Sequence, residues 1–241
     1  FINQQLSRTS GFTALEINAG SMRNRGIEIA LNGDVIRTRD MVLNLNANYT
    51  FNKNEIVDLG QVDEFELGTS IVREGLPFGT HYIVEWAGVD PATGAPLYVD
   101  LDGNVTPEFS DDFAKADFGT WLPPVTGGFG LDFSWRNLSV RSQFNYSYGN
   151  KLFNNQLFFQ ENHGFAGFNQ RTKMLTIWQE PGDITEIQSS DFPRQFSSKD
   201  IEDASYIRFR NVMVSYTVPG RYFNNEVRNV RLFVQGQNLY T

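Results

Sequence analysis

The residues of this chain that can support chemistry are few and scattered. The two histidines, His81 and His163, have no HExxH or GxSxG sequence around them, so a zinc or nucleophilic site would need partners that the spacing does not supply. We expect both histidines to lie in exposed loops or at the rim of the fold. Cysteine is absent, which excludes disulfides and thiolate metal sites. The sequence therefore predicts no catalytic residue and no enzyme activity.

One short acidic stretch, DLDGN, invites a calcium interpretation through Asp100, Asp102 and Asn104. A calcium-binding EF-hand loop needs its glycine at position 6 and a glutamate at position 12. Here Gly103 falls at position 4, and no glutamate stands at position 12. An Asp-Gly hairpin turn explains the stretch more simply. Calcium in this loop stays the lesser alternative, and no other metal or cofactor is expected.

Three tryptophans, Trp86, Trp121 and Trp178, are candidates for contact with a substrate or partner. They lie in or beside two long segments that we interpret as loops. A flat indole there can stack on a substrate ring or pack against a partner protein. Packing within the loops themselves is the alternative, and the sequence leaves both open.

The composition limits the class of protein. The net charge of the 241 residues is −8, which argues against nucleic acid as the main partner. Mean hydropathy is −0.36, and no run approaches the roughly 18 apolar residues of a membrane helix. The 21 Phe and 9 Tyr suit a membrane β-barrel, which concentrates aromatic residues in two girdles. The first residues, FINQQLSRTSGF, show no signal peptide, so we expect either a mature chain or the middle of a longer protein.

A strict alternation from Met41 to Asn52 indicates how the chain folds. Apolar side chains occupy the odd positions and asparagines most of the even ones, so a strand here has one apolar and one amide-lined face. At roughly 9–11 residues per crossing, this pattern fits a transmembrane β-strand. We expect lipid contact for Leu43, Leu45, Tyr49 and Phe51. We expect the amides of Asn44, Asn46 and Asn48 to line a wet lumen, where they form a hydrated wall or bind sugar hydroxyls.

The alternation recurs and predicts an all-β fold with six antiparallel spanning strands. These are residues 25–33, 41–52, 128–136, 138–148, 206–218 and 230–240. The parity slips at Arg210–Asn211, which predicts a β-bulge. Short connections alternate with long ones at 53–127 and 149–205, as short periplasmic turns alternate with long extracellular loops in bacterial barrels. Six strands cannot close a barrel in lipid, so we predict that the chain forms part of a larger barrel. The alternative is a soluble carbohydrate-binding β-sandwich.

Six segments of the sequence also resemble segments of a known family, and they occur in the same order as in that family. These are SGFTALEINAGSMRNRGIEIALNG (10–33), NANYTFNKNEIVDLG (46–60), EGLPFGTHYIVEWAGVDPATGAPLYVDLDGN (74–104), LPPVTGGFG (122–130), IEDASYIRFRNVMVSYTVP (201–219) and VRLFVQGQNLYT (230–241). They are similar to segments of the SusC/RagA-type TonB-dependent transporters of Bacteroidota outer membranes. At Arg25 the family more often has lysine.

This resemblance implies a C-terminal part, residues 1–241, of a 22-stranded transmembrane barrel, without the N-terminal plug domain. It implies location in the outer membrane of a Gram-negative bacterium and contact with outer-membrane lipid. It implies a SusD-like surface lipoprotein as partner, and TonB as energy source through a segment outside this sequence. The implied function is uptake of oligosaccharides or peptides without covalent chemistry.

Overall fold

The computed structural model describes residues 2–5, 14–17, 20–60, 62, 64–165, 167–224 and 227–241. The chain forms two compact units. The strand unit comprises residues 24–53, 123–149 and 204–241, and the loop unit comprises residues 1–23, 54–122 and 150–203. No helix among the described residues is long and apolar enough to cross a membrane.

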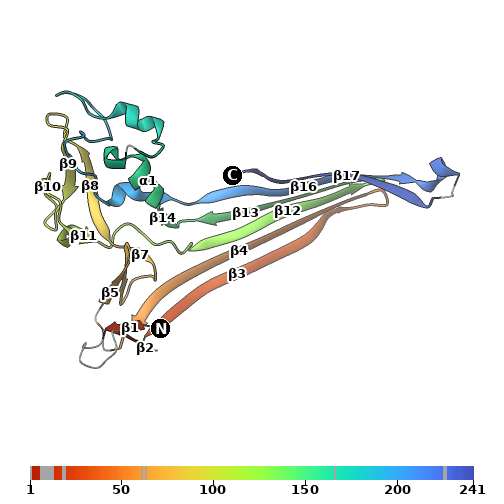
Figure 1. Cartoon of the computed structure of the whole chain (residues 1–241). Coiled ribbons are helices and arrows are strands. Elements are labelled where there is room, and N and C mark those ends of the chain that lie inside the picture. Colours follow the sequence, from red (N-terminus) through yellow and green to blue (C-terminus); the bar gives the residue numbers. More distant parts are fainter. Residues whose placement is uncertain are drawn as a thin grey trace. The chain divides into compact units, whose positions relative to one another are not determined.

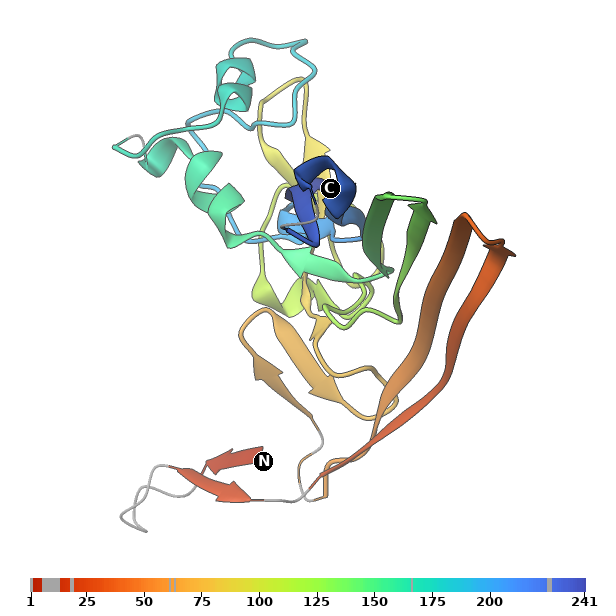
Figure 2. The same cartoon turned by 90° about the vertical axis from the view of Figure 1, so that its right-hand side faces the viewer.

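The strand unit is one six-stranded sheet in the order β17-β16-β13-β12-β4-β3 (Figure 1). Its strands are β3 (Ser21–Arg37), β4 (Met41–Asp58), β12 (Val125–Trp135), β13 (Leu138–Tyr148), β16 (Tyr206–Pro219) and β17 (Asn229–Tyr240). The hairpins β3–β4 (red to orange) and β12–β13 (green) are neighbours in this sheet, with β4 next to β12 (Figure 2). The prediction of an all-β, antiparallel fold is confirmed. β3 and β4 are longer than the alternation indicated, because both strands continue beyond the apolar segment.

The predicted β-bulge in the strand after residue 205 is confirmed. Gln143 of β13 is opposite Asn211, but the next residue, Phe144, is opposite Phe209. Arg210 is therefore the extra residue, and the pairing of β16 with β17 shifts at the same place. The insertion explains the parity slip: apolar residues before and after Arg210 stay on one face although their numbers change parity.

The loop unit contains short elements rather than structureless loops. Its strands are β1 (Ile2–Gln5), β2 (Ala14–Ile17), β5 (Glu64–Leu67), β6 (Ser70–Arg73), β7 (Thr80–His81), β8 (Ile83–Val89), β9 (Pro96–Val99), β10 (Val105–Thr106), β11 (Ala114–Lys115), β14 (Lys151–Phe153) and β15 (Ile201–Asp203). Among its described residues the loop unit also contains one α-helix, α1 (Asn155–Gln160), and short 3₁₀ helices at Asp111–Phe113, His163–Phe165, Thr172–Thr176 and Ser198–Asp200. A further 3₁₀ turn, Gly220–Phe223, joins β16 to β17 in the strand unit.

The loop unit has its own apolar core. Ile56, Leu59 and Val72 are buried together, with Phe65 and Phe78 packed against them. Tyr98 is 1% exposed, and the ring of Phe109 packs edge-on against it with centroids 5.1 Å apart. The long connections between spanning strands are therefore folded structures that can hold side chains in fixed positions.

Candidate functional site

The cross-strand register of the strand unit gives it one apolar face. Residues directly opposite each other in an antiparallel pair point to the same side. One such row contains Leu43, Phe133, Val140, Val214 and Val234. Another contains Ala47, Phe129, Phe144, Phe209 and Tyr240, in which the three phenylalanine rings stack with centroids 4.9 and 4.4 Å apart.

Side chains of this face are open to solvent even on the central strands of the sheet. Leu45 on β4 and Phe129 on β12 are each 42% exposed. Soluble proteins rarely leave a contiguous apolar surface of this kind open to water. The apolar face therefore has the character of a surface that meets hydrocarbon.

Aromatic residues mark both ends of the apolar face. Met41, Trp135 and Tyr216 share its last row near the short turns. Phe51 and Tyr148 share the first row near the long connections, both opposite Val125. Ten residues separate Met41 from Phe51, which at about 3.3 Å per residue and the usual barrel tilt gives a height of roughly 25 Å. That height matches the apolar band of an outer-membrane barrel.

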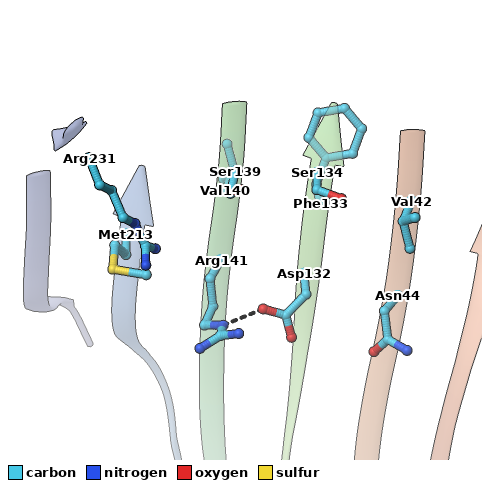
Figure 3. A pocket seen from close by; sticks show the side chains of 10 residues that line it. All are labelled: Val42, Asn44, Asp132, Phe133, Ser134, Ser139, Val140, Arg141, Met213 and Arg231. Atoms are coloured by element: carbon cyan, nitrogen blue, oxygen red, sulfur yellow. Dashed lines mark hydrogen bonds and ion pairs between the residues drawn. The ribbon is translucent and has the colours of Figure 1, made fainter. Parts of the chain in front are cut away.

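The opposite face of the same sheet is polar. One row contains Asn44, Asp132, Arg141, Met213 and Gln235, and the next contains Asn46, Gly130, Gln143, Asn211 and Gln237. A shallow pocket of about 390 Å³ lies on this face (Figure 3).

Most of the charged and amide side chains around this pocket have a polar partner on a neighbouring strand. Arg141 forms an ion pair with Asp132, directly opposite on β12 (Figure 3). Arg231 donates to the hydroxyl oxygen of Ser215 over 3.1 Å, and the Asn44 amide donates to Asp34 over 3.0 Å. A surface of paired charges and amides can stay hydrated and offer hydrogen bonds to a polar solute. The predicted division into an apolar and an amide-lined face is thus present in the register.

Trp121 packs inside the loop unit, together with a histidine that sequence reasoning misplaced. The rings of Phe78 and His81 lie edge-on to it at centroid distances of 5.7 and 6.3 Å. His81 is 1% exposed, and its Nε2 lies 3.0 Å from the carbonyl oxygen of Lys151. The expectation that His81 is exposed is wrong, because a backbone group seventy residues away in sequence provides its partner. His163, in its 3₁₀ turn, is half-buried.

Trp178 covers a turn whose sequence is DPATG. Asp90 accepts hydrogen bonds from the Ala92 amide over 3.0 Å and the Thr93 hydroxyl over 2.6 Å, and these bonds lower the pKa of the Asp90 carboxyl. Gly94 adopts a φ of +71°, and a side chain there would collide with the Trp178 indole. The indole Nε1 donates to the Pro91 carbonyl over 3.0 Å. The turn and the indole therefore fix each other.

The stretch considered for calcium is a hairpin turn between β9 and β10. One Asp100 carboxylate oxygen accepts the amides of Asp102 and Asn104 over 2.9 and 2.8 Å, and the other accepts the Asn104 side chain over 3.0 Å. These hydrogen bonds lower the pKa of Asp100. Gly103 has a φ of +85°, as a tight turn requires. Across the described residues, no group of three or more acidic or histidine side chains is placed to hold a metal ion.

Trp86 packs against the buried phenol ring of Tyr98, at a centroid distance of 5.8 Å. Burial raises the pKa of Tyr98 to about 12. The Lys199 ammonium lies 5.0 Å from the centroid of the Trp86 indole, close enough for a cation–π interaction. Each of the three tryptophans is half-buried and packed by residues of its own unit, and contact with substrate stays a prediction.

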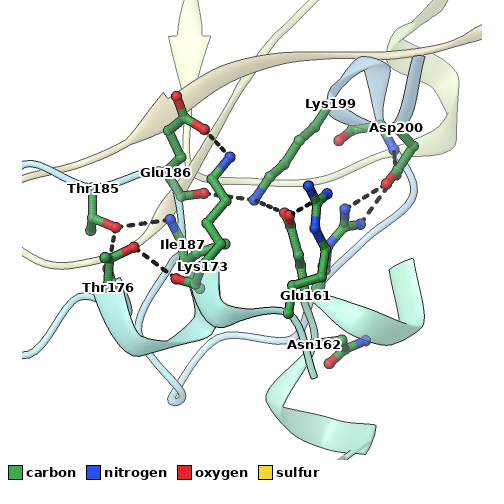
Figure 4. A network of polar contacts seen from close by, with 12 residues as sticks. Glu161, Asn162, Lys173, Thr176, Thr185, Glu186, Ile187, Lys199 and Asp200 are labelled. Carbon is green, nitrogen blue, oxygen red and sulfur yellow. Dashed lines mark hydrogen bonds and ion pairs between the residues drawn. The ribbon is translucent and has the colours of Figure 1, made fainter. Parts of the chain in front are cut away.

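A network of ion pairs around the buried Glu161 carboxylate joins distant residues of the loop unit (Figure 4). Glu161, with 2% of its side chain exposed, pairs with Arg171 over 3.0 Å and with Lys199 over 3.7 Å. Lys199 also donates to the Glu186 carbonyl over 2.6 Å, and the Glu186 carboxylate pairs with Lys173. Burial and the charges of Arg194 and Lys173 lower the pKa of Lys199 to about 8.

Arg194 and Asp200 form a second buried ion pair. Two hydrogen bonds of 2.5 and 3.1 Å join the guanidinium to the carboxylate, and their side chains are 3% and 0% exposed. Sequence reasoning missed both networks. Isolated charged residues in a loop carry no periodic signal that would distinguish a buried pair from a solvated one.

No protein-family model matches the chain. Curated relatives include TonB-dependent receptors P3 and P26 of Formosa agariphila, which are 27% and 28% identical to it over 98% and 97% of its length. The chain spans about a quarter of the length of these relatives.

Solved structures similar to the chain include the RagAB peptide transporter, with a TM-score of 0.89 and 30% identity over 98% of the chain and 28% of that protein. The RagAB peptide importer in its "closed-closed" state matches with a TM-score of 0.88 and 31% identity, over 98% of the chain and 28% of that protein. These relatives are receptors and transporters rather than enzymes. The chain therefore belongs with the TonB-dependent receptors of the SusC/RagA type, which are β-barrel proteins of the outer membrane in Bacteroidota.

Proposed function

We propose that this chain forms part of the wall and the extracellular loops of a TonB-dependent importer that takes up oligosaccharides or peptides. The observation that carries the proposal is the two-faced sheet, which has one apolar face and one polar face. In this proposal the strand unit crosses the outer membrane as part of a 22-stranded barrel. Its apolar face contacts lipid and its polar face lines the lumen.

We place the loop unit on the extracellular side, where it contacts substrate and a SusD-like lipoprotein. Leu175 and Ile184 support this, because they are 82% and 94% exposed within the segment that the Glu161 network braces. Large apolar side chains held rigidly in the open suit a protein interface. The similar RagAB structures are of a peptide transporter, which is compatible with a loop unit that meets peptides.

The polar face supports import without covalent change of the substrate. Around the 390 Å³ pocket Asp132 is paired with Arg141, Arg231 donates to a serine hydroxyl, and an amide and two further serines stand among the lining side chains. Such a wall offers exchangeable hydrogen bonds to a passing solute. In this proposal the energy for transport comes from TonB.

Uptake by cells that carry the complete transporter tests the proposal. We expect uptake of a labelled oligosaccharide or peptide to stop when TonB is removed, and the imported molecule to be recovered intact. Uptake that persists without TonB would instead indicate a passive porin, and cleavage of the substrate by the purified protein would indicate an enzyme.

Capture of the lipoprotein tests the placement of the loop unit. A Leu175→Asp/Ile184→Asp variant should lose the co-purifying lipoprotein while the barrel still assembles. Leu101→Asp, which changes an exposed residue (65%) of the β9–β10 turn in the same unit, is the matched control. Equal capture by the two variants would contradict the assignment of the partner surface to residues 175 and 184.

A further inference from the structure

Two cations lie on the apolar face of the strand unit, at its end near the long connection 53–127. The side chain of Asn52 donates to Asn24 over 3.1 Å, and that of Asn44 donates to Asn32 over 3.1 Å. Both pairs place even-numbered residues of β3 and β4 on the polar face. The short turn joins Arg37 to Met41, the Asn44 side chain also donates to Asp34 over 3.0 Å, and Arg23 pairs with Glu55, so the residues of these three pairs are directly opposite each other. Arg25 must then share the apolar face with the odd-numbered residues of both strands.

This register places Arg25 directly opposite Lys53, and Ile27 opposite Phe51. Directly opposite residues of an antiparallel pair have Cβ atoms roughly 4.5–5.5 Å apart, so the two cations are immediate neighbours. Both residues are therefore just beyond the aromatic row that contains Phe51 and Tyr148. In a barrel, that row marks the boundary between hydrocarbon and lipid headgroups.

Neither cation is neutralised within the protein. Arg25 and Lys53 are exposed, and neither has a hydrogen-bond or ion-pair partner among the residues that the structure describes. Glu55, the next carboxylate along β4, is paired with Arg23 over 2.9 Å. Two unpaired cations at the headgroup boundary attract an anion from the membrane surface.

An apolar groove of about 140 Å³ lies on the same strands, further into the apolar face. Ala47 is at its floor, and larger side chains from four neighbouring strands surround it: Ile29, Leu31, Tyr49, Phe129 and Tyr146. Ala47 is four residues before Phe51, a distance of roughly 13 Å along the strand. A molecule that occupies both features must therefore have an anionic group and an apolar chain about this far apart.

We propose that Arg25, Lys53 and the Ala47 groove form a binding site for a phosphorylated, acylated lipid of the outer leaflet. Arg25 and Lys53 hold the phosphate, the guanidinium by paired hydrogen bonds and the ammonium as a point charge. An acyl chain fills the groove. The site rests on the membrane placement proposed above, and its continuity with the apolar face favours a membrane lipid over a free anion, which would leave the groove empty.

Lipid retention in bilayer nanodiscs tests this proposal. The complete transporter is reconstituted in phosphatidylcholine nanodiscs, either pure or doped with lipid A, and the lipid A retained after exchange into detergent is quantified by native mass spectrometry. At about fivefold per cation near a membrane surface, Arg25→Gln/Lys53→Gln should weaken retention roughly 25-fold. Ala47→Trp and Ala47→Leu, which fill the groove, should also weaken it. Arg39→Gln, which removes an exposed cation at the short-turn end, should have no effect.

Two further measurements distinguish the ways in which the proposal can fail. Inorganic phosphate added in excess should not displace lipid A, and displacement would overturn the lipid assignment in favour of a free-anion site. A nitroxide at Leu45→Cys in pure phosphatidylcholine should report contact with lipid. Lipid contact at residue 45 together with unchanged lipid A retention in Arg25→Gln/Lys53→Gln would overturn this site alone. Water contact at residue 45 would overturn the membrane placement and the site with it.

Discussion

The ring of Tyr146 on β13 lies over Gly127, its directly opposite partner on β12. A side chain at Gly127 would collide with this ring and with the Asn48 carbonyl, to which the Tyr146 hydroxyl donates over 3.3 Å. The missing side chain thus lets an aromatic ring cross the neighbouring strand and reach the one beyond it. The contact links β13, β12 and β4 on the apolar face.

Gly127→Ala should therefore destabilise the barrel. Overpacking of this kind costs about 1–3 kcal/mol, whereas Gly33→Ala, on β3 with no atom within reach of a new side chain, should be neutral or stabilising. Urea unfolding of the refolded barrel in detergent measures both. Tyr146→Ala should remove the part of the penalty that the ring causes, so the double variant should lose less stability than the two single changes added together. Equal stability of Gly127→Ala and Gly33→Ala would contradict the contact.

Two adjacent residues of β4 should respond oppositely to a charge. An arginine at a lipid-facing midplane position costs roughly 2–4 kcal/mol, whereas a lumen position tolerates it. Leu45→Arg should consequently lower the free energy of unfolding in lipid much more than Asn46→Arg. Similar losses in the two titrations would show that the assignment of the faces is wrong.

The buried pair Arg194–Asp200 should be essential to the loop unit. Asp200→Ala leaves the Arg194 guanidinium buried without its partner, which costs about 3–5 kcal/mol. The control is Asp203→Ala, which breaks the 2.8 Å ion pair between Asp203 and Lys151. The Asp203 side chain is 58% exposed, and exposed ion pairs contribute only about 0–1 kcal/mol. Urea unfolding followed by tryptophan fluorescence distinguishes them. A small effect of Asp200→Ala would mean that water reaches Arg194.

Lys199 should make the stability of the loop unit depend on pH. Its pKa is lowered from 10.5 to about 8 in the folded state, so between these values the unfolded chain binds more protons and stability rises with pH. The gain, on the order of 3 kcal/mol by pH 10.5, is lost again as the pH falls through 8. In Lys199→Met the increase in the free energy of unfolding between pH 8 and 10 should vanish. An unchanged increase would show that another group causes it.

Tyr98 should give the opposite dependence at higher pH. Burial raises its pKa from 10.0 to about 12, so the folded state retains the phenolic proton where the unfolded chain has lost it. Stability is full below pH 10 and falls as the pH rises through 12. The free energy of unfolding of Tyr98→Phe, measured across this pH range, should not show this decrease. A decrease of the same size in the variant would exclude Tyr98 as its source.

Much of the strand unit was predictable because its signal is local. A period of two over ten or more residues marks a strand such as β4 and its faces without knowledge of its neighbours, and the parity slip at Arg210 located the bulge. The loop unit gave no such signal. Strands of two residues, such as β7, are too short to show a period, and the burial of His81 depends on Lys151 far along the chain. The Arg194–Asp200 pair likewise depends on how distant segments pack.

The central claim is that the sheet separates lipid from a wet lumen, and a cysteine scan from residue 42 to residue 51 tests it most directly. The sequence has no native cysteine, so each variant carries a single label. In outer membranes, odd positions such as Leu45 should resist a water-soluble thiol reagent and give nitroxide spectra relaxed by oxygen. Even positions such as Asn46 should react with the reagent. A pattern without this alternation, or with its parity reversed, would contradict the account.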